Sequence, residues 1–246
     1  MISAILINLA RSKDRLERMD AQLRSLGVPY ARLDACDGAQ IPADERRAWT
    51  GSRTWLDGQV GVFVSHFNAW RIAAAAATPY TLILEDDLHL SRDVAKLCRN
   101  LDWIPPAADI VRLETTMQGM RIGSGARILD SERKLSLLKS EAWGAGAYFV
   151  ERDVAKWLIA TPPRYYYPPD YFLFYKKFSP VAAALKIFQI SPALAIQDKF
   201  LPDRSRRVNL ESLIDEPSRT RTRHIVDEMS RRIGRRLIGR TLVEFR

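Results

Sequence analysis

Cysteine and long apolar runs are scarce in this sequence of 246 residues, and each shortage excludes a class of protein. The two cysteines, Cys36 and Cys98, cannot form a disulfide framework, and neither belongs to a CxxC or Cys/His cluster that would indicate zinc. No window approaches the roughly 18–20 consecutive apolar residues of a transmembrane helix. The apolar residues 2–9 lack a preceding positive charge and run into a charged segment, so they predict a strand and not a signal peptide. We therefore expect a protein of a reducing compartment that does not cross a membrane.

Positive charge is concentrated toward the carboxyl end of the chain. Residues 204–246 contain twelve arginines and six acidic residues, and so contribute +6 of the net charge of +9. Within them, Ile225, Met229, Ile233 and Leu237 recur every four residues among arginines, which predicts an imperfect basic amphipathic helix. We expect residues 1–205 to form the domain that carries the chemistry, and residues 206–246 to form a basic tail that binds an anionic membrane surface.

Apolar runs of strand length alternate with helical patterns along the domain. Leu16, Met19, Leu23 and Leu26 recur on one face of a helix that Gly27 ends. Further helical patterns cover residues 67–77 and 153–159, and the strand-like runs are residues 4–9, 28–33, 80–85, 110–113 and 148–150. This order predicts an α/β fold, with a mixed, mostly parallel sheet flanked by helices and ligands bound at the carboxyl ends of the strands.

Three consecutive carboxylates, Glu85, Asp86 and Asp87, follow the clearest of the buried strands. Unpaired carboxylates this close would repel one another, and a shared Mg²⁺ or Mn²⁺ would relieve the repulsion. Such a cation usually completes its shell with water and substrate phosphates, so the triplet predicts a phosphate-bearing substrate. Glu85 and Asp87 project to the same side of an extended segment, which makes them the expected metal ligands. A solvated loop after the strand is the alternative interpretation.

Four separate blocks of the sequence carry a family pattern: residues 5–15 (ILINLARSKDR), 34–38 (DACDG), 61–66 (GVFVSH) with Trp70, and 82–87 (LILEDD). In this order they resemble glycosyltransferase family 25, the family of lipopolysaccharide biosynthesis transferases and collagen galactosyltransferases. Residues 144–148, residues 169–170 and the Gln197 region match more loosely, and the resemblance covers roughly residues 2–205. It implies a Rossmann-like GT-A fold, a UDP-sugar donor, Mn²⁺ (or Mg²⁺) as cofactor, and inversion at the anomeric carbon.

The resemblance also implies a mechanism. A cation held by Asp87 and Glu85 would bridge the diphosphate, while another carboxylate takes the proton of the acceptor hydroxyl. We expect Asp170 to be this base, with Glu114 as the second choice. Asp170 follows two prolines, and a helix N-cap explains it equally well.

Polar residues after the first strands are candidates for binding the donor. Guanidinium groups offer paired donors to phosphate oxygens, and a glycine beside an aspartate permits a tight turn against a ribose. A solvated helical turn and a plain Asx turn are the alternatives, and Ser65 and His66 rest on the resemblance. The predicted donor-binding residues are Asn8, Arg11, Arg15, Asp34, Asp37, Gly38, Ser65, His66 and Asp86.

Two positions depart from the family pattern. Gln59 stands where the family usually has an acid, and Val62 where it usually has a cysteine. Neither departure removes a carboxylate of the triplet, so we expect them to affect donor preference.

Other classes of protein remain as alternatives: a transferase-like binding module without turnover, a basic nucleic-acid-binding protein, and a metal-dependent phosphohydrolase. Residues 1–200 lack interleaved basic and aromatic residues, so no nucleic acid is expected, and three histidines are few for a phosphohydrolase. We expect a hexosyltransferase, with galactose favoured, that uses a lipid-linked or oligosaccharide acceptor of the cell envelope. Its expected location is cytoplasmic, peripheral on the inner face of a bacterial inner membrane.

Overall fold

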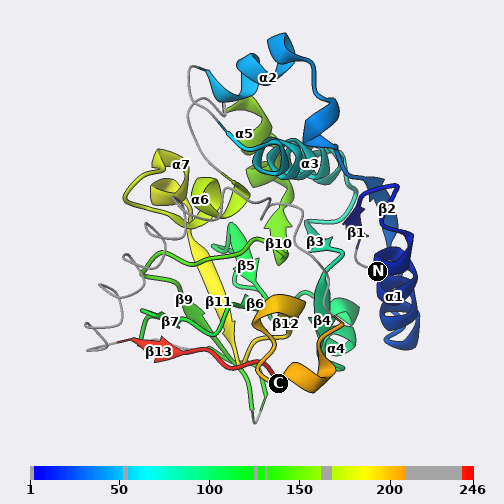
Figure 1. Cartoon of the computed structure of the whole chain (residues 1–246). Coiled ribbons are helices and arrows are strands. Elements are labelled where there is room, and N and C mark those ends of the chain that lie inside the picture. The colour runs from blue at the N-terminus through cyan, green and yellow to red at the C-terminus, as the bar shows by residue number, and fades with distance from the viewer. Residues whose placement is uncertain (1–2, 52–54, 125–126, 131, 162–167, 209–239) are drawn as a thin grey trace.

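The fold is organised around an eight-stranded sheet with helices on both faces (Figure 1). The computed structural model describes residues 3–51, 55–124, 127–130, 132–161, 168–208 and 240–246. In spatial order the strands are β2 (Ala31–Asp34), β1 (Ser3–Asn8), β3 (Tyr80–Glu85), β10 (Ala147–Glu151), β5 (Ile110–Arg112), β11 (Ile187–Ser191), β9 (Lys134–Leu137) and β8 (Arg127–Ile128). β10 and β9 run against the other six strands. The predicted mixed, mostly parallel α/β sheet is confirmed.

Two smaller sheets lie beside the large one. β12 (Ala195–Gln197) pairs with β4 (Leu88–Leu90) and with β6 (Glu114–Thr115), and β13 (Thr241–Leu242) pairs with β7 (Gly119–Met120). β4 follows β3 directly, and β6 follows β5. The small sheet of β4, β12 and β6 therefore continues from the carboxyl ends of two central strands and brings Gln197 close to Glu85.

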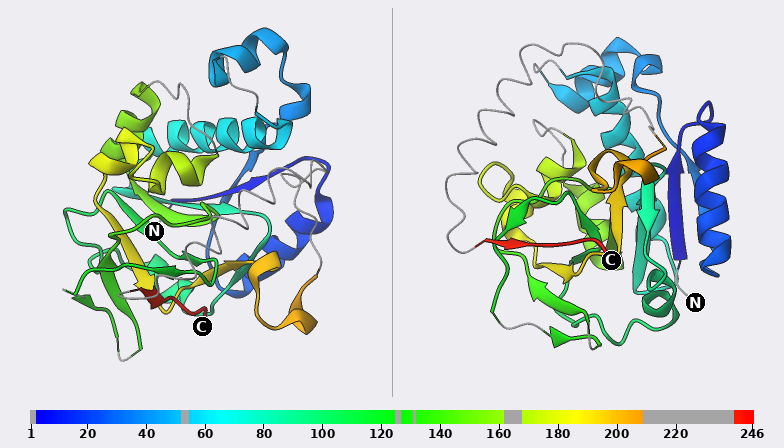
Figure 2. Two further views of the ribbon diagram at one scale, coloured as in Figure 1. Left: turned by 60° about the vertical axis from the view of Figure 1, so that its left-hand side comes forward. Right: turned by 60° about the horizontal axis from the view of Figure 1, so that its bottom comes forward.

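The helices cover the two faces of the large sheet (Figure 2). Ile5 and Ile7 of β1 pack in the core under α3, α5 and α6, whereas Ala4 and Leu6 pack in the core under α1 and α4. Burial on both faces explains why β1 is a continuous apolar run. The helices are α1 (Lys13–Ser25), α2 (Ala43–Thr50), α3 (Asp57–Ala74), α4 (Val94–Arg99), α5 (Arg152–Ala160), α6 (Pro169–Phe174) and α7 (Pro180–Ala184), with 3₁₀ turns η1 (Gly38–Gln40), η2 (Asp198–Phe200) and η3 (Arg204–Arg206). Within the described ranges, none of the helices has the length and apolar character needed to span a membrane.

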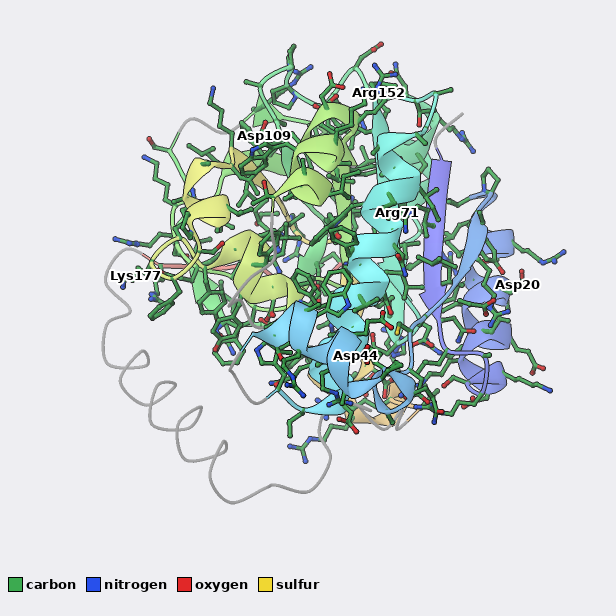
Figure 3. The ribbon with its side chains drawn as sticks, turned by 90° about the horizontal axis from the view of Figure 1, so that it is seen from above. Asp20, Asp44, Arg71, Asp109, Arg152 and Lys177 are labelled. Atoms are coloured by element: carbon green, nitrogen blue, oxygen red, sulfur yellow. The ribbon has the colours of Figure 1, made fainter. Side chains whose placement is uncertain are left out.

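α3 begins ten residues earlier than the apolar pattern predicts. Its first turns are rich in glycine and valine, which are weak helix formers, so the sequence pattern there does not indicate a helix. Burial supplies the missing stability, because Val60, Phe63 and Val64 are all in the core. Figure 3 shows α3 running beside α5, with Arg71 labelled on α3.

β2 begins three residues later than predicted, at Ala31. The backbone N–H of Val28 donates to the carbonyl of Leu23, 2.9 Å away, and so closes the end of α1. Val28 is buried, but in the turn that ends the helix and not in the strand.

The last seven residues, which the sequence placed in the tail, pack on the domain. Besides the pairing of β13 with β7, the Thr115 hydroxyl donates to the Val243 carbonyl (2.5 Å), and the Ala193 N–H donates to the Glu244 carbonyl (2.6 Å). Val243 is fully buried. The remainder of the predicted amphipathic tail, residues 209–239, lies outside the described residues.

Replacing Val243 by aspartate is expected to lower the free energy of unfolding by about 3 kcal/mol, because it buries a carboxylate without a partner. The matched control is Leu242→Asp at the preceding residue, which ends β13 and is 50% exposed. Urea denaturation would measure both variants. Equal effects would mean that the carboxyl end is not part of the folded domain.

Candidate active site

One cavity collects the carboxyl ends of β1 and β3, the loop after β2 and the first turns of α3. Its volume is about 360 Å³, a size that suits a small organic ligand. Of the predicted site residues, those that line it are Asn8, Arg11, Arg15, Asp37, Gly38, Ser65, Glu85, Asp86 and Asp87. These residues come from four separate segments of the sequence, and the fold brings them together.

The three carboxylates of the acidic triplet (Glu85, Asp86 and Asp87) differ in their hydrogen-bond partners. Both oxygens of Asp86 accept hydrogen bonds, from Asn8 Nδ2 at 2.7 Å and from Arg15 Nη1 at 3.1 Å. The oxygens of Glu85 face His66 Nε2 at 3.0 Å and Gln197 Nε2 at 3.3 Å. Asp87 Oδ1 is buried and has no hydrogen-bond partner among the described residues.

The surroundings of Asp86 and Asp87 disfavour the ionised forms of these two side chains. Burial, and then the neighbouring Glu85, raise the pKa of Asp87 to about 7. Burial also raises the pKa of Asp86, although its bonds to Asn8 and Arg15 oppose that change. A positive group arriving beside Asp87 would relieve this cost.

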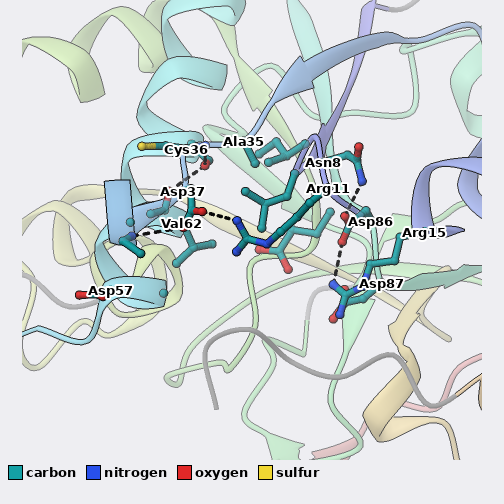
Figure 4. Close-up of a pocket in the computed structure, with 18 of the residues that line it drawn as sticks. Asn8, Arg11, Arg15, Ala35, Cys36, Asp37, Asp57, Val62, Asp86 and Asp87 are labelled. Carbon is teal, nitrogen blue, oxygen red and sulfur yellow. Dashed lines mark hydrogen bonds and ion pairs between the residues drawn. The ribbon is translucent and has the colours of Figure 1, made fainter. Parts of the chain in front are cut away.

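Arginines after β1 face the acids across the cavity (Figure 4). Arg11 forms an ion pair with Asp37, and Arg15 with Asp86. The Arg11 side chain is 52% exposed and that of Arg15 is 12% exposed, so Arg11 has more freedom to turn toward a ligand. The cavity therefore offers guanidinium groups and carboxylates within one small volume, which suits an anionic ligand accompanied by a cation.

Close contact between two backbone segments forms the wall of the cavity. A Cβ atom on Gly38 would lie 1.7 Å from the Asp57 carbonyl oxygen, and one on Gly61 would lie 2.6 Å from the Cys36 carbonyl oxygen. Side chains at either position would push α3 away from the loop after β2. The sequence predicts a tight turn at Gly38, and the close approach of α3 is a second reason why this position needs a glycine.

The two candidate bases lie outside this cavity, around loop 144–146. Glu114 is fully buried; its Oε2 accepts from the Gly146 N–H at 2.7 Å, and its Oε1 has no partner among the described residues. Burial raises the pKa of Glu114 to about 8, against the attraction of Arg112. Gly144 has φ +82°, and a Cβ on it would lie 2.5 Å from Glu114 Oε1.

Asp170 sits in the first turn of α6, not at its N-cap. Its Oδ2 accepts from the Gly144 N–H at 3.2 Å and its Oδ1 from the Tyr171 N–H at 2.9 Å, so both oxygens are occupied. Burial nevertheless raises the pKa of Asp170. Arg112 holds the same loop by donating to the carbonyls of residues 143 and 144.

Two further predicted donor-binding residues do not line the cavity. Asp34 ends β2 on its exposed side and forms an ion pair with Arg32 at 2.6 Å. His66 is fully buried beneath the cavity, where it contacts Glu85. The lining also includes Trp55, Leu56 and Asp57, which sequence reasoning missed because the segment before α3 carries no recognisable pattern.

The departures from the family pattern have structural explanations. Gln59 Oε1 accepts from the Leu56 N–H at 3.0 Å, the bond that a glutamate would also make at the third position of a helix. Val62 lines the cavity, so this departure changes its surface directly.

The residues at the acidic triplet fit a cation that takes most of its ligands from water and substrate phosphates. Within the described part of the chain, no three His, Cys, Asp or Glu side chains are arranged as a metal site. Asp87 has a buried oxygen without a partner, and Glu85 lies beside it. Mg²⁺ and Mn²⁺ accept such a set when substrate phosphates and water complete the shell.

One family model covers most of the chain. The model of glycosyltransferase family 25 (LPS biosynthesis protein) matches residues 1–173. The chain is 24% identical over 255 residues to the lacto-N-neotetraose biosynthesis glycosyltransferase LgtE of Neisseria meningitidis serogroup B, covering 93% of this chain and 88% of that protein. It is 30% identical over 112 residues to procollagen galactosyltransferase 2 of Mus musculus, covering 39% of this chain and 18% of that protein. A solved glycosyltransferase involved in the glycosylation of the major capsid of PBCV-1 matches with 12% identity and a TM-score of 0.42, over 84% of this chain and 96% of that one, a likeness too slight to support an argument.

Proposed function

The chain belongs to glycosyltransferase family 25, and from this membership we propose that it transfers a hexose, with galactose favoured, from a UDP-sugar to a glycan of the cell envelope. The names of two relatives support this choice, since one acts in lacto-N-neotetraose biosynthesis and the other is a procollagen galactosyltransferase. The acceptor we propose is a lipid-linked or free oligosaccharide, such as the lipopolysaccharide core.

One observation carries the proposal: a cavity of about 360 Å³ in which the acidic triplet faces Arg11 and Arg15. A nucleoside diphosphate needs cationic groups for its phosphates and hydroxyl-binding groups for its ribose. Arg11 and Arg15 supply the first, and Asp37 beside Gly38 supplies the second. When Arg11 binds a phosphate oxygen it would leave its ion pair with Asp37, and phosphate binding would thereby free Asp37 for the ribose.

Asp87 and Glu85 would hold a divalent cation at the proposed site. When bound, Mn²⁺ or Mg²⁺ would neutralise the charge that develops on the departing diphosphate. Asn8 and Arg15 fix Asp86, which keeps the turn after β3 in place. His66 and Gln197 orient Glu85.

For the base we place Glu114 ahead of Asp170, the reverse of the order expected from the sequence. Both carboxylate oxygens of Asp170 accept hydrogen bonds from backbone N–H groups, whereas one oxygen of Glu114 has no partner among the described residues. A pKa near 8 also suits a group that must take a proton at neutral pH. In a single displacement with inversion, this carboxylate would accept the acceptor's hydroxyl proton as the sugar leaves UDP; because Glu114 is fully buried against Gly144, the step requires loop 144–146 to move and expose its oxygen.

Transfer of radiolabelled galactose from UDP-galactose to truncated lipooligosaccharide, with UDP release followed in parallel, tests the proposal. Transfer that requires the acceptor, with inverted configuration at the anomeric carbon by NMR, is the expected result. UDP release that is faster without acceptor would indicate a phosphohydrolase, and UDP binding without release would indicate a binding module.

We also propose that the basic segment beyond residue 208 holds the protein on an anionic membrane, at the inner face of the bacterial inner membrane. Replacing Arg235 and Arg236 by glutamine should weaken sedimentation with phosphatidylglycerol vesicles about thirtyfold, at roughly 1 kcal/mol per arginine. The matched control replaces both by lysine, which keeps the charge. Unchanged binding of the glutamine variant would contradict the membrane proposal, and transfer to a soluble acceptor should be the same in all three proteins.

A further inference from the structure

A chain of buried hydrogen bonds ends on Glu85. Trp70 Nε1 lies 2.8 Å from the Tyr148 hydroxyl, and that hydroxyl lies 2.9 Å from His66 Nδ1. His66 Nε2 then lies 3.0 Å from Glu85 Oε1. The side chains of Trp70, Tyr148 and His66 are fully buried, so solvent does not compete for these bonds.

Only one order of donors and acceptors satisfies the whole chain. The indole N–H can only donate, so the Tyr148 oxygen accepts from Trp70 and its single hydrogen is left for His66. Nδ1 of His66 is then an acceptor, and the ring proton lies on Nε2, from which it is donated to the Glu85 carboxylate. With the proton on Nδ1, the Tyr148 hydrogen would lack an acceptor among the described residues, and a lone pair on Nε2 would face the carboxylate.

We propose that Tyr148 and His66 are positioning residues for the donor site: the Tyr148 hydroxyl holds His66 in its Nε2–H tautomer, and His66 thereby fixes the Glu85 carboxylate. The backbone of Glu85 is already fixed, because its N–H donates to the Gly146 carbonyl at 2.8 Å. Gln197 holds the second carboxylate oxygen. A hydroxyl in the core under α3 thus controls the orientation of a carboxylate in the cavity.

The part of this inference that concerns ligand affinity rests on the proposed function. Hydrogen-bond partners behind a metal ligand typically change metal affinity by about 10- to 100-fold when removed. Tyr148 acts on Glu85 through His66, so loss of its hydroxyl should weaken Mn²⁺-dependent UDP binding by about tenfold, the lower end of that range, although Tyr148 does not line the cavity.

The experiment compares Tyr148→Phe with Tyr80→Phe. Tyr80 is also a buried tyrosine with one hydroxyl hydrogen bond, to the Ala108 carbonyl at 2.8 Å, but it lies at the opposite end of β3 from the triplet. Tyr148→Phe loses two buried hydrogen bonds and Tyr80→Phe loses one, and thermal unfolding measures how far each loss destabilises the fold. Calorimetry with UDP and Mn²⁺ should show weaker binding for Tyr148→Phe alone; equal affinities of wild type and Tyr148→Phe would overturn the proposal.

A second measurement needs neither UDP nor Mn²⁺. The chain has three histidines, so ¹⁵N NMR can resolve the ring nitrogens, with a His66→Gln variant assigning the His66 signals. The Nε2–H tautomer is expected in the wild type and a mixture of tautomers in Tyr148→Phe. An Nδ1–H tautomer in the wild type would overturn the proposal. Failure of the wild type to bind UDP would instead overturn the proposed function, and the tautomer would still decide this inference.

Discussion

Replacing Asp87 by asparagine is expected to lower sugar transfer by about a thousandfold, the scale on which removal of one group that stabilises charge in a transition state acts. One carboxylate oxygen of Asp87 has no hydrogen-bond partner among the described residues, and its pKa is raised to about 7 because burial and Glu85 disfavour its charge. Asparagine keeps the size of the side chain but removes the charge that would attract a cation. Initial rates of transfer from UDP-galactose at saturating Mn²⁺ would measure the loss.

The control for this variant is Asp20→Asn, an aspartate on α1 (Figure 3) that is paired with Arg24 and does not line the cavity. Its transfer rate should be that of the wild type. Normal transfer by Asp87→Asn would mean that the acidic triplet does not hold the cation.

Replacing Glu114 by glutamine is expected to lower the turnover number by about a hundred- to ten-thousandfold, the usual contribution of a general base. UDP affinity should stay unchanged, because Glu114 does not line the cavity and its carboxylate hydrogen-bonds to the Gly146 N–H and not to a side chain of the acidic triplet. A base works in its ionised form, so kcat/KM of the wild type should rise with pH up to about 8, the raised pKa of Glu114. In Glu114→Gln the rise should end near pH 7, because only the raised pKa of Asp87 remains.

Asp170→Asn provides the comparison. Asparagine keeps an oxygen that can accept from the Gly144 N–H, so this variant should retain most of the transfer activity. Loss of turnover in Asp170→Asn, with normal turnover and the pH-dependent rise intact in Glu114→Gln, would exchange the two assignments.

The strands that could be predicted from the sequence are those that are buried on both faces. β1 and β3 are buried on both faces, so their sequences are unbroken apolar runs, and the acidic triplet is conspicuous where the second run stops. Parallel strands ending at one edge then bring Asn8 to Asp86, as the α/β pattern predicts. The family resemblance added the neighbouring blocks.

The remainder depends on contacts between distant segments, which leave little trace in a local pattern. The start of α3 is stabilised by packing against the loop after β2 and not by its own residues. The bond between His66 and Tyr148 joins residues 82 positions apart, although both lie in blocks that resemble the family. Asp34 looked equivalent to Asp37 in the sequence, yet it lies at the exposed end of β2, paired with Arg32.

The central claim is that the cavity at the acidic triplet binds UDP together with a divalent cation. Titration calorimetry of UDP into the purified protein, with and without Mn²⁺, tests it directly when the wild type is compared with Asp87→Ala. We predict UDP binding by the wild type that strengthens with Mn²⁺, and no effect of Mn²⁺ in the variant. Absence of UDP binding by the wild type in either condition would contradict the claim.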